Sequence, residues 1–332
     1  MTNAREPTCS TISTLAPLVD FKLITNDVDD LVRLYPGWKG QFQQVSAGRF
    51  HGTVQVVQGL GVRVFRGTTD QVLLTRGASQ PGWIDFSPIT TRNQTCRWQG
   101  RQCDENHVVV RGADVGVDNL ASRGAEIITV SIRVDLLRKA AANALRFDGD
   151  PERINWQCHR VEPAGLAALK QLAERITERS ALDTNELETC DVCVIEQEFV
   201  MAALNVIGSR NEAGANKPRG NRTAIIRRGE EYLREHLAFP VGLIDMCEEL
   251  GVSARTIQYA FRERFGIGPI EYLRMLRLNA VKSDLKLASN QKLTVRDVAV
   301  KWGYRHLGNF AADYKRHFGV LPSKARSGSI GQ

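Results

Sequence analysis

The sequence predicts an α+β fold, with a β-rich N-terminal part that carries appended helices and an all-α C-terminal part with two helix-turn-helix units. Three observations predict it. Hydrophobic residues alternate with a period of two between residues 42 and 134, the period lengthens to three or four after Pro151, and one helix pair is duplicated near the C-terminus. With 332 residues, of which 42% are hydrophobic, the chain can bury two separate cores.

Short apolar segments between residues 42 and 134 favour a β-barrel or a β-sandwich. Phe50, Val54 and Val56 alternate with polar residues, as in a strand that buries one face. Many short strands with turn residues between them are typical of both folds. The further apolar segments are 62–66, 71–75, 83–86, 107–110 and 126–132.

Two amphipathic helices are predicted to follow, over about 163–179 and 185–207, within a helical region of 163–207. Leu166, Leu169 and Ile176 recur at helical spacing along the first. Their apolar faces need a cover, which the barrel wall, a second subunit or both can supply.

A flexible linker is predicted at 209–221, where SRNEAGANKPRGN contains three Gly or Pro residues and no apolar residue larger than Ala. The linker divides the chain into a first domain of 15–208 and a second of 222–326.

Positive charge is concentrated after the linker. Residues 222–332 hold 19 Lys and Arg against 11 Asp and Glu, a net charge of +8, whereas the preceding 221 residues hold the remaining 25 and 26, a net charge of −1. A basic domain joined to a neutral one indicates a polyanionic partner. No apolar run reaches the ~18 residues of a membrane span, and the N-terminus lacks the pattern of a signal peptide, so we expect a cytoplasmic protein without membrane contact.

The C-terminal part contains an internal duplication. At an offset of 52 residues the apolar positions of 243–252 match those of 295–304, with Gly251 opposite Gly303. Each copy predicts a short helix, a turn in which glycine adopts positive φ, and a second helix whose outer face can enter a DNA groove. A helical hairpin repeat without DNA is the alternative, and the local charge of +8 favours DNA.

One helix is predicted to join the two copies, from Pro269 to about Lys286. Eighteen residues at ~1.5 Å each give a length of ~27 Å. Successive major grooves on one face of DNA lie ~34 Å apart, so a stiff connection of this length lets both copies face the same side of a duplex.

The second copy resembles the signature of the AraC/XylS family of bacterial transcription regulators, in the pattern Val298-Ala-x3-Gly-Tyr-x5-Phe310-x3-Tyr314-Lys-x2-Phe-Gly-x2-Pro322-x3-Arg326. The resemblance covers about residues 222–326 and is highly specific. It implies a cupin-like effector-binding barrel and a helical dimerisation segment ahead of the DNA-binding domain, which 15–208 would supply. The stretches HLGNFAADYKRHFG and FQQVSAGRFHG are most similar to ethanolamine-utilisation operon regulators.

The resemblance also implies which side chains contact DNA. The recognition helices should begin near Ser253 and His306, and the late cations of each should contact phosphates. The second departs from the common pattern at Gly308 and Ala312, which indicates fewer base contacts. The candidate base readers are Arg255, Thr256, Gln258, Tyr259, His306, Leu307, Asn309 and Ala312, and the candidate phosphate contacts are Arg262, Arg264, Lys315 and Arg316.

Aromatic residues of the C-terminal part are expected at packing positions, whereas those of the β-rich part leave two interpretations open. They can wall an effector pocket inside the barrel, or they can be ordinary core residues. The first group is Phe261, Phe265, Trp302, Phe310, Tyr314 and Phe318; the second is Trp38, Phe50, Trp83 and Trp98.

The cysteines and histidines give only weak indications of a redox, metal-binding or catalytic site. Cys190 and Cys193 form a CxxC on a predicted helix, and Cys96 and Cys103 flank a polar segment, but neither pair is part of a four-ligand zinc set. His51 and His107 are isolated. We therefore expect no catalytic residue, no metal, no cofactor and no enzymatic activity.

The leading hypothesis is an effector-controlled regulator that binds double-stranded DNA, forms a homodimer, and as an activator contacts RNA polymerase. The effector is a small molecule that the sequence does not identify. One alternative is a redox sensor that uses the cysteine pairs. Another treats the β-rich part as an oligomerisation module without a ligand.

Overall fold

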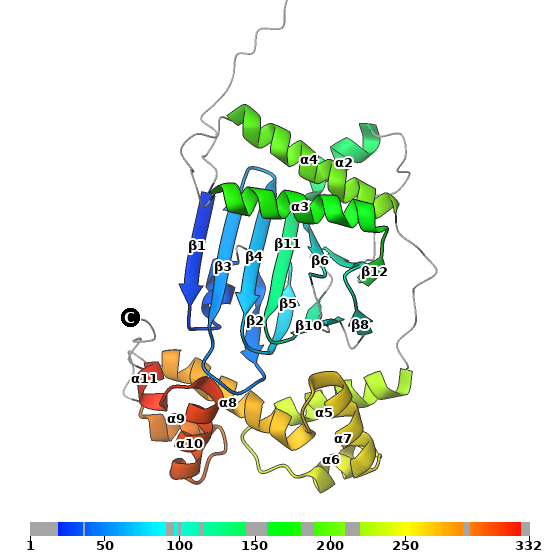
Figure 1. The fold of residues 1–332 in the computed structure, drawn as a ribbon. Helices are drawn as coiled ribbons and strands as arrows, with labels where there is room; N and C mark the ends of the chain where they lie inside the picture. The colour runs from blue at the N-terminus through cyan, green and yellow to red at the C-terminus, as the bar shows by residue number, and fades with distance from the viewer. Residues whose placement is uncertain are drawn as a thin grey trace, which may run out of the picture.

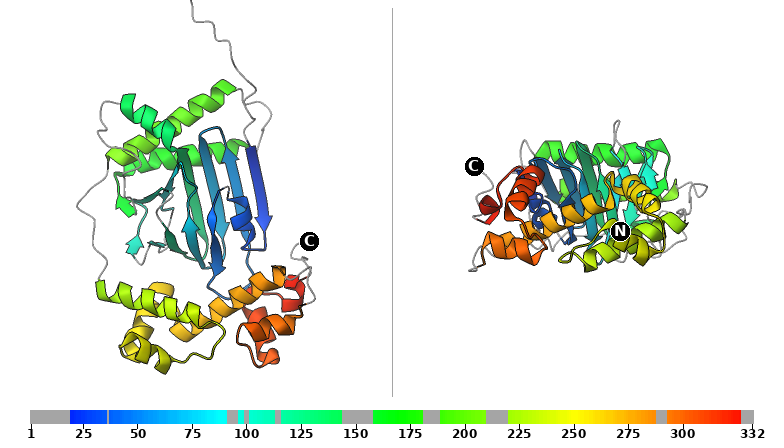
Figure 2. Two further views of the ribbon diagram at one scale, coloured as in Figure 1. Left: turned by 180° about the vertical axis from the view of Figure 1, so that it is seen from behind. Right: turned by 90° about the horizontal axis from the view of Figure 1, so that it is seen from below.

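The computed structural model describes residues 19–35, 37–90, 96–98, 101–112, 116–143, 158–180, 189–209, 220–287 and 293–326. The strands lie in the middle of the molecule, with α2–α4 at one end and α5–α11 at the other (Figures 1 and 2). The linker predicted at 209–221 falls almost entirely outside the described residues, and the domain boundaries drawn from it stay a prediction.

Two open antiparallel sheets form the β-rich part, and within the described residues they do not close into the expected barrel. Alternating hydrophobicity predicts strands but leaves the choice between closure and stacking open, because both bury one face of each strand. The seven-stranded sheet runs in the order β1 (Val19–Thr25), β3 (Gly52–Gln58), β4 (Val62–Thr69), β11 (Ala125–Arg133), β6 (Trp83–Pro88), β9 (His107–Arg111) and β12 (Cys158–Arg160). The five-stranded sheet runs in the order β2 (Lys39–Gln44), β5 (Leu73–Ala78), β10 (Val117–Ala121), β7 (Cys96–Trp98) and β8 (Arg101–Cys103).

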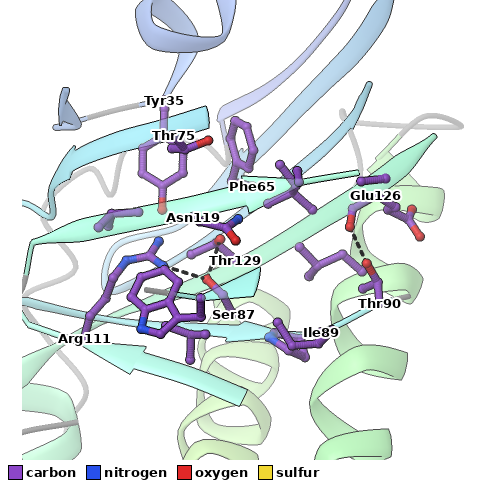
Figure 3. Close-up of a pocket in the computed structure, with 18 of the residues that line it drawn as sticks. Tyr35, Phe65, Thr75, Ser87, Ile89, Thr90, Arg111, Asn119, Glu126 and Thr129 are labelled. Carbon is purple, nitrogen blue, oxygen red and sulfur yellow. Dashed lines mark hydrogen bonds between the residues drawn. The ribbon is translucent and has the colours of Figure 1, made fainter. Parts of the chain in front are cut away.

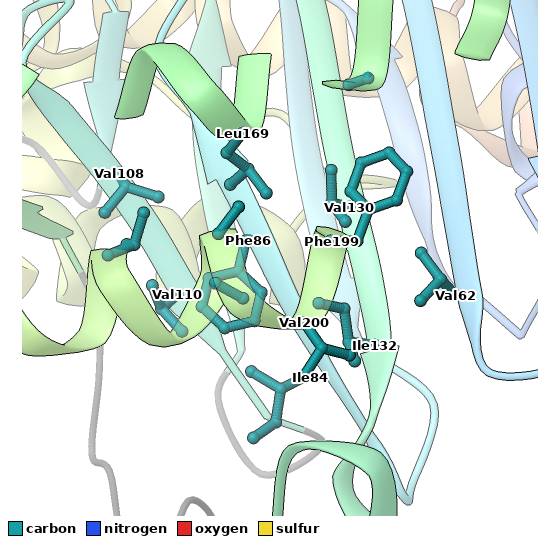
Figure 4. Packing of buried hydrophobic residues seen from close by; sticks show 14 of the residues in the cluster. Val62, Ile84, Phe86, Val108, Val110, Val130, Ile132, Leu169, Phe199 and Val200 are labelled. Atoms are coloured by element: carbon teal, nitrogen blue, oxygen red, sulfur yellow. The ribbon is translucent and has the colours of Figure 1, made fainter. Parts of the chain in front are cut away.

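Helices cover the outer face of the seven-stranded sheet. The first predicted helix is confirmed as α3 (Pro163–Ser180), and the second as α4 (Thr189–Gly208); the start expected at residue 185 lies outside the described residues. Leu169 and Phe199 from these helices pack against Phe86 and Val130 of the sheet in one apolar cluster (Figure 4). The seven-stranded sheet, and not the wall of a barrel, therefore covers the apolar faces of these helices within one chain. Two further helices, α1 (Asp30–Leu34) and α2 (Val134–Asn143), were not predicted from the sequence.

The five-stranded sheet is covered on both faces, and residues of β5 and β10 alternate between them. On β5, Leu73 packs between the two sheets and Leu74 packs among the C-terminal helices. On β10, Val117 faces the inter-sheet core while Leu120 joins Leu74 on the helical side. One layer of backbone therefore separates the interior of the β-rich part from the C-terminal helices.

The C-terminal part is helical throughout its described residues, as predicted. The helix that joins the duplicated copies is α8, continuous from Pro269 to Leu287, close to the predicted span. The remaining helices are α5 (Gly220–Glu235), α6 (Leu243–Leu250), α7 (Ala254–Phe265), α9 (Val295–Lys301), α10 (Leu307–Phe318) and α11 (Pro322–Arg326). None of the described helices has both the length and the apolar composition needed to cross a membrane.

Candidate nucleic-acid interface

The first helix pair, α6 and α7, turns at a glycine and begins its second helix with a side-chain cap. Gly251 ends α6 with φ +66°, a conformation that residues with a Cβ rarely adopt. Ser253 then caps α7, because its Oγ accepts a hydrogen bond from the backbone N–H of Thr256 at 3.3 Å. These two local signals set the angle at which α7 leaves the turn.

Packing fixes which side of α7 faces outward. Ile257, Phe261 and Phe265 are buried beneath it, and the rings of Phe265 and Tyr272 stack with centroids 4.4 Å apart. The opposite face exposes Arg255 and 56% of the Tyr259 side chain surface. Of the remaining first-helix candidates, Thr256 and Gln258 are half-buried.

The second helix pair, α9 and α10, repeats this arrangement, but its second helix lacks a side-chain cap. Thr294 caps α9 through a reciprocal pair of hydrogen bonds with Asp297, and Gly303 turns the chain with φ +84°. His306 occupies the cap position of α10 but makes no side-chain cap bond there. Of the second-helix candidates, Leu307 is half-buried and the other three are exposed: His306, Asn309 and Ala312.

Both pairs are built on α8. Leu273 and Leu276, in its first half, belong to the apolar cluster of the first pair, and Val281 and Leu285, in its second half, to the cluster of the second. At ~1.5 Å per residue, the 19 residues of α8 span ~28 Å. The exposed faces of α7 and α10 are thus carried by one continuous helix.

The phosphate candidates do not share one environment. Arg262, Lys315 and Arg316 are exposed, as a phosphate contact requires. Arg264 departs from the expectation: only 4% of its side chain is exposed, and its Nη2 donates to Asp118 Oδ1 of β10 at 2.7 Å. In this arrangement Arg264 holds α7 to the five-stranded sheet and does not present a charge to DNA.

Two further cations lie beside the candidate surface and were missed from the sequence. The Arg222 guanidinium lies 5.0 Å from the centre of the Tyr259 ring and 3.3 Å from Glu263. Arg305 is exposed directly before His306. The basic composition of the segment was the available signal, but composition does not say which cations gather around a helix.

Besides Arg264–Asp118, further ion pairs hold the C-terminal helices to the β-rich part. Arg76 of β5 donates to Glu230 of α5 at 2.6 Å, and Lys282 of α8 donates to Asp27 at 2.8 Å. Burial alone raises the pKa of Asp27, but Lys282 and Lys286 outweigh it and lower that pKa to about 2. Asp27 is therefore a carboxylate at neutral pH, and it holds the second half of α8.

The predicted cysteine pairs receive no support from the described side chains. Those of Cys96 and Cys190 lie outside the described residues, and Cys193 is exposed. Cys103 Sγ lies 2.9 Å from Cys158 Sγ, a buried neighbour that the sequence gave no reason to expect. The described residues contain no group of three or more potential metal ligands.

Comparisons with known proteins concentrate on this interface. A family model described as a helix-turn-helix domain matches residues 246–328, which include most of α6 and all of α7–α11. The probable thc operon regulatory protein of Rhodococcus erythropolis is 31% identical over 128 residues, 38% of this chain and 39% of that protein. The XylDLEGF operon transcriptional activator 2 of Pseudomonas putida is 29% identical over 97 residues, 29% of this chain and 62% of that protein. The C-terminal helices of this chain are therefore similar to the helix-turn-helix regions of operon regulators.

The similarity is confined to part of each sequence, since the chain spans 39% and 62% of these two relatives. Both relatives are named as regulators of operons, not as enzymes. Among solved structures, a probable AraC family regulator from Rhodopseudomonas palustris is 28% identical over 32% of this chain and 99% of its own, with a TM-score of 0.30. The AraC-like activator CuxR is 13% identical over 85% of this chain and 100% of its own, with a TM-score of 0.42.

Proposed function

We propose that this protein is a cytoplasmic, effector-responsive transcription activator that reads two successive major grooves of its operator. The recognition helices are α7 and α10, and each supplies base contacts from its exposed face. The observation that carries the proposal is the mounting of two duplicated helix pairs on one unbroken α8 of ~28 Å, which suits the ~34 Å repeat of the major groove.

The two recognition helices have different tasks in this proposal. Arg255 and Gln258 suit guanine and adenine, which these side chains recognise with paired hydrogen bonds in the major groove. On α10, Leu307, Gly308 and Ala312 offer no comparable polar group, so Lys315 and Arg316 would hold that half to phosphates. Sequence specificity then resides mainly in the half-site under α7.

The remaining parts of the proposal, namely the effector, the homodimer and the contact with RNA polymerase, rest on the resemblance to the AraC/XylS family. The β-rich part binds a small-molecule effector, the protein acts as a homodimer on its operator, and activation proceeds through contact with RNA polymerase. Effector binding shifts the balance between two arrangements of the DNA-binding helices, which requires different affinities for the two.

A spacing experiment tests the two-groove proposal. Footprinting on the neighbouring promoter defines the protected site, and mobility shifts then compare that site with versions that carry 5 or 10 extra base pairs between its halves. A rigid α8 predicts a large loss of affinity with both insertions, because the first turns one half-site to the opposite face and the second moves it a full turn away. Affinity that is unchanged by the insertions would show that only one helix pair reads DNA.

Salt dependence gives a second, independent readout. Affinity should fall steeply as salt rises, because phosphate contacts release counterions from the duplex. An affinity that does not change between 50 and 200 mM salt would contradict DNA binding through this surface.

A further inference from the structure

A cavity of about 70 Å³ lies between the two sheets, and we refer to it as the inter-sheet cavity. Figure 3 shows its lining side chains converging from both sheets. Aromatic rings form part of its wall, and two of the four aromatic residues that the sequence offered as pocket walls, Trp38 and Trp98, are among them. The aromatic lining residues are Tyr35, Trp38, Phe42, Phe65 and Trp98.

Three lining residues carry buried polar atoms that have no hydrogen-bond partner among the described residues. They are Trp38 Nε1, Trp98 Nε1 and Thr75 Oγ1, and each of these side chains is at least nine-tenths buried. Native structures rarely leave such atoms unpaired, and each unpaired atom is destabilising. An indole N–H can only donate, so a molecule that satisfies the two tryptophans must bring a hydrogen-bond acceptor.

Charged groups on the cavity wall are already compensated by protein partners. Arg111 Nε lies 3.3 Å from Asp85 Oδ2, and its Nη1 donates to Ser87 at 3.2 Å. Glu126, on the same wall, accepts from Arg66 at 2.6 Å. A charged ligand would therefore enter an apolar space without an uncompensated counter-charge, which burial penalises strongly. The cavity chemistry favours an uncharged ligand.

We propose that the inter-sheet cavity binds a small uncharged carbonyl compound, an amide or a ketone. A carbonyl oxygen supplies the acceptor that the indole N–H groups require, and an apolar remainder suits the aromatic wall. The cavity is smaller than the ~150 Å³ space that accommodates benzene in an engineered protein, which favours a ligand of only a few non-hydrogen atoms. This inference rests on the proposed function, because it assigns the effector site and the chemical class of the effector.

The position of the cavity connects it to the DNA-binding helices through one layer of backbone. Thr75 of β5 and its cross-strand partner Asn119 of β10 line the cavity. Each is adjacent in sequence to a residue that points the other way: Arg76 pairs with Glu230 of α5, and Asp118 pairs with Arg264 of α7. A ligand that shifts Thr75 and Asn119 therefore displaces the strands that anchor the first helix pair.

Three small molecules of matched size test the proposed ligand class on the full-length chain. Acetamide, acetate and acetamidinium each have four non-hydrogen atoms and are neutral, anionic and cationic. At constant ionic strength, acetamide should raise the melting temperature with a half-maximal effect between ~0.1 and 10 mM, a range set by so small a ligand. Acetate and acetamidinium should have no effect over the same range. A larger shift with either ion, or no shift with acetamide, would overturn the proposal.

Conservative variants locate the binding site. Trp98→Phe keeps an aromatic ring, smaller than the indole, and removes the N–H, and Thr75→Val keeps the shape and removes the hydroxyl. Each should weaken the acetamide effect at least several-fold. Trp83→Phe is the control, because Trp83 lies outside the cavity with Arg63 over its ring at 4.5 Å. Circular dichroism checks that the variants fold; undiminished acetamide affinity in both folded cavity variants would contradict the site.

Measurements of promoter binding distinguish a failure of the ligand assignment from a failure of the proposed function. Acetamide should change the affinity of the chain for its promoter several-fold, and Trp98→Phe should remove the change. If the chain binds promoter DNA but acetamide changes neither affinity nor melting temperature, the ligand assignment is wrong and the proposed function stands. If the chain binds no promoter DNA at any salt concentration, the proposed function is wrong, whatever the melting temperatures show.

Discussion

The two helix pairs share a plan but differ in how they are supported and in what they expose. The first pair forms one apolar core with Leu74 and Leu120 of the five-stranded sheet, whereas the core of the second contains only residues of the C-terminal helices. The first exposes Arg255 on α7, whereas the second exposes His306, Asn309 and Ala312 at and along α10. The pair that exposes Arg255 is thus the one whose apolar core is continuous with the five-stranded sheet.

The largest expected effect tests the shared core. Leu74→Ala should lower the free energy of unfolding by about 2–5 kcal/mol, because Leu74 is fully buried between sheet and helices. Hydrogen exchange should also quicken in α5–α7 more than in α9–α10. Leu73→Ala is the matched control, since Leu73 is equally buried but faces the inter-sheet core. If both variants lose hydrogen-exchange protection equally in α5–α7, the five-stranded sheet does not separate the inter-sheet core from the core of the first helix pair.

The ion pairs of Asp27 with Lys282 and Lys286, which hold the second half of α8, should stabilise the fold in a pH-dependent way. The pKa of Asp27 is lowered to about 2 from an ordinary 3.8, so its carboxylate stabilises the fold above pH 4, and this contribution is lost as the pH falls from about 4 to 2. The shift corresponds to about 2 kcal/mol. Asp27→Asn should therefore lower stability in urea by about this amount at pH 7 and by much less at pH 2. Asp135→Asn, which removes an exposed partner of Arg133, should have little effect at either pH.

Base readout should be unequal between the two recognition helices. Arg255→Ala should weaken operator binding by about 1–3 kcal/mol and relax specificity at one base pair, as the loss of a paired contact to guanine would. Asn309→Ala on α10 should weaken it less. Mobility shifts on operators substituted one base pair at a time measure both effects. A greater loss of specificity with Asn309→Ala would show that α10, and not α7, contributes most of the sequence specificity.

The smallest effect distinguishes two arginines of one helix. Arg262 is exposed and Arg264 is buried against Asp118, although only one residue separates them. Arg262→Ala should reduce the slope of log affinity against log salt by about 1, as the loss of one phosphate contact does. Arg264→Met should leave that slope unchanged. If Arg264→Met lowers the slope as well, the DNA-bound protein releases α7 from the sheet.

The C-terminal helices could be predicted from the sequence because their signals are local. Gly251 and Gly303 mark the turns, Ser253 and Thr294 mark helix starts, and α8 follows from the spacing of its apolar residues. The exposed positions of α7 and α10 follow from the same periodicity. These features depend on residues within a few positions of one another, which a linear pattern records.

Contacts between residues that lie far apart in the sequence could not be predicted in this way. Arg264 was expected at the DNA because it lies late on a recognition helix, but its partner Asp118 is 146 residues away in the sequence. Leu73 and Leu74 form part of an apolar run without alternation, because their strand is covered on both faces. The division of the β-rich part into two sheets depends on which strands pair, and hydrophobic alternation does not encode that choice.

The alternation along β5 restricts how the length of this strand can change during evolution. A single residue inserted ahead of Leu73 would exchange the two faces of every position that follows, up to the strand end. Thr75 would turn toward the helices and Arg76 into the aromatic interior, so the inter-sheet cavity and the ion pair of Arg76 with Glu230 would be lost together. Insertions and deletions ahead of this strand are therefore tolerable only when a bulge or a second length change restores the register.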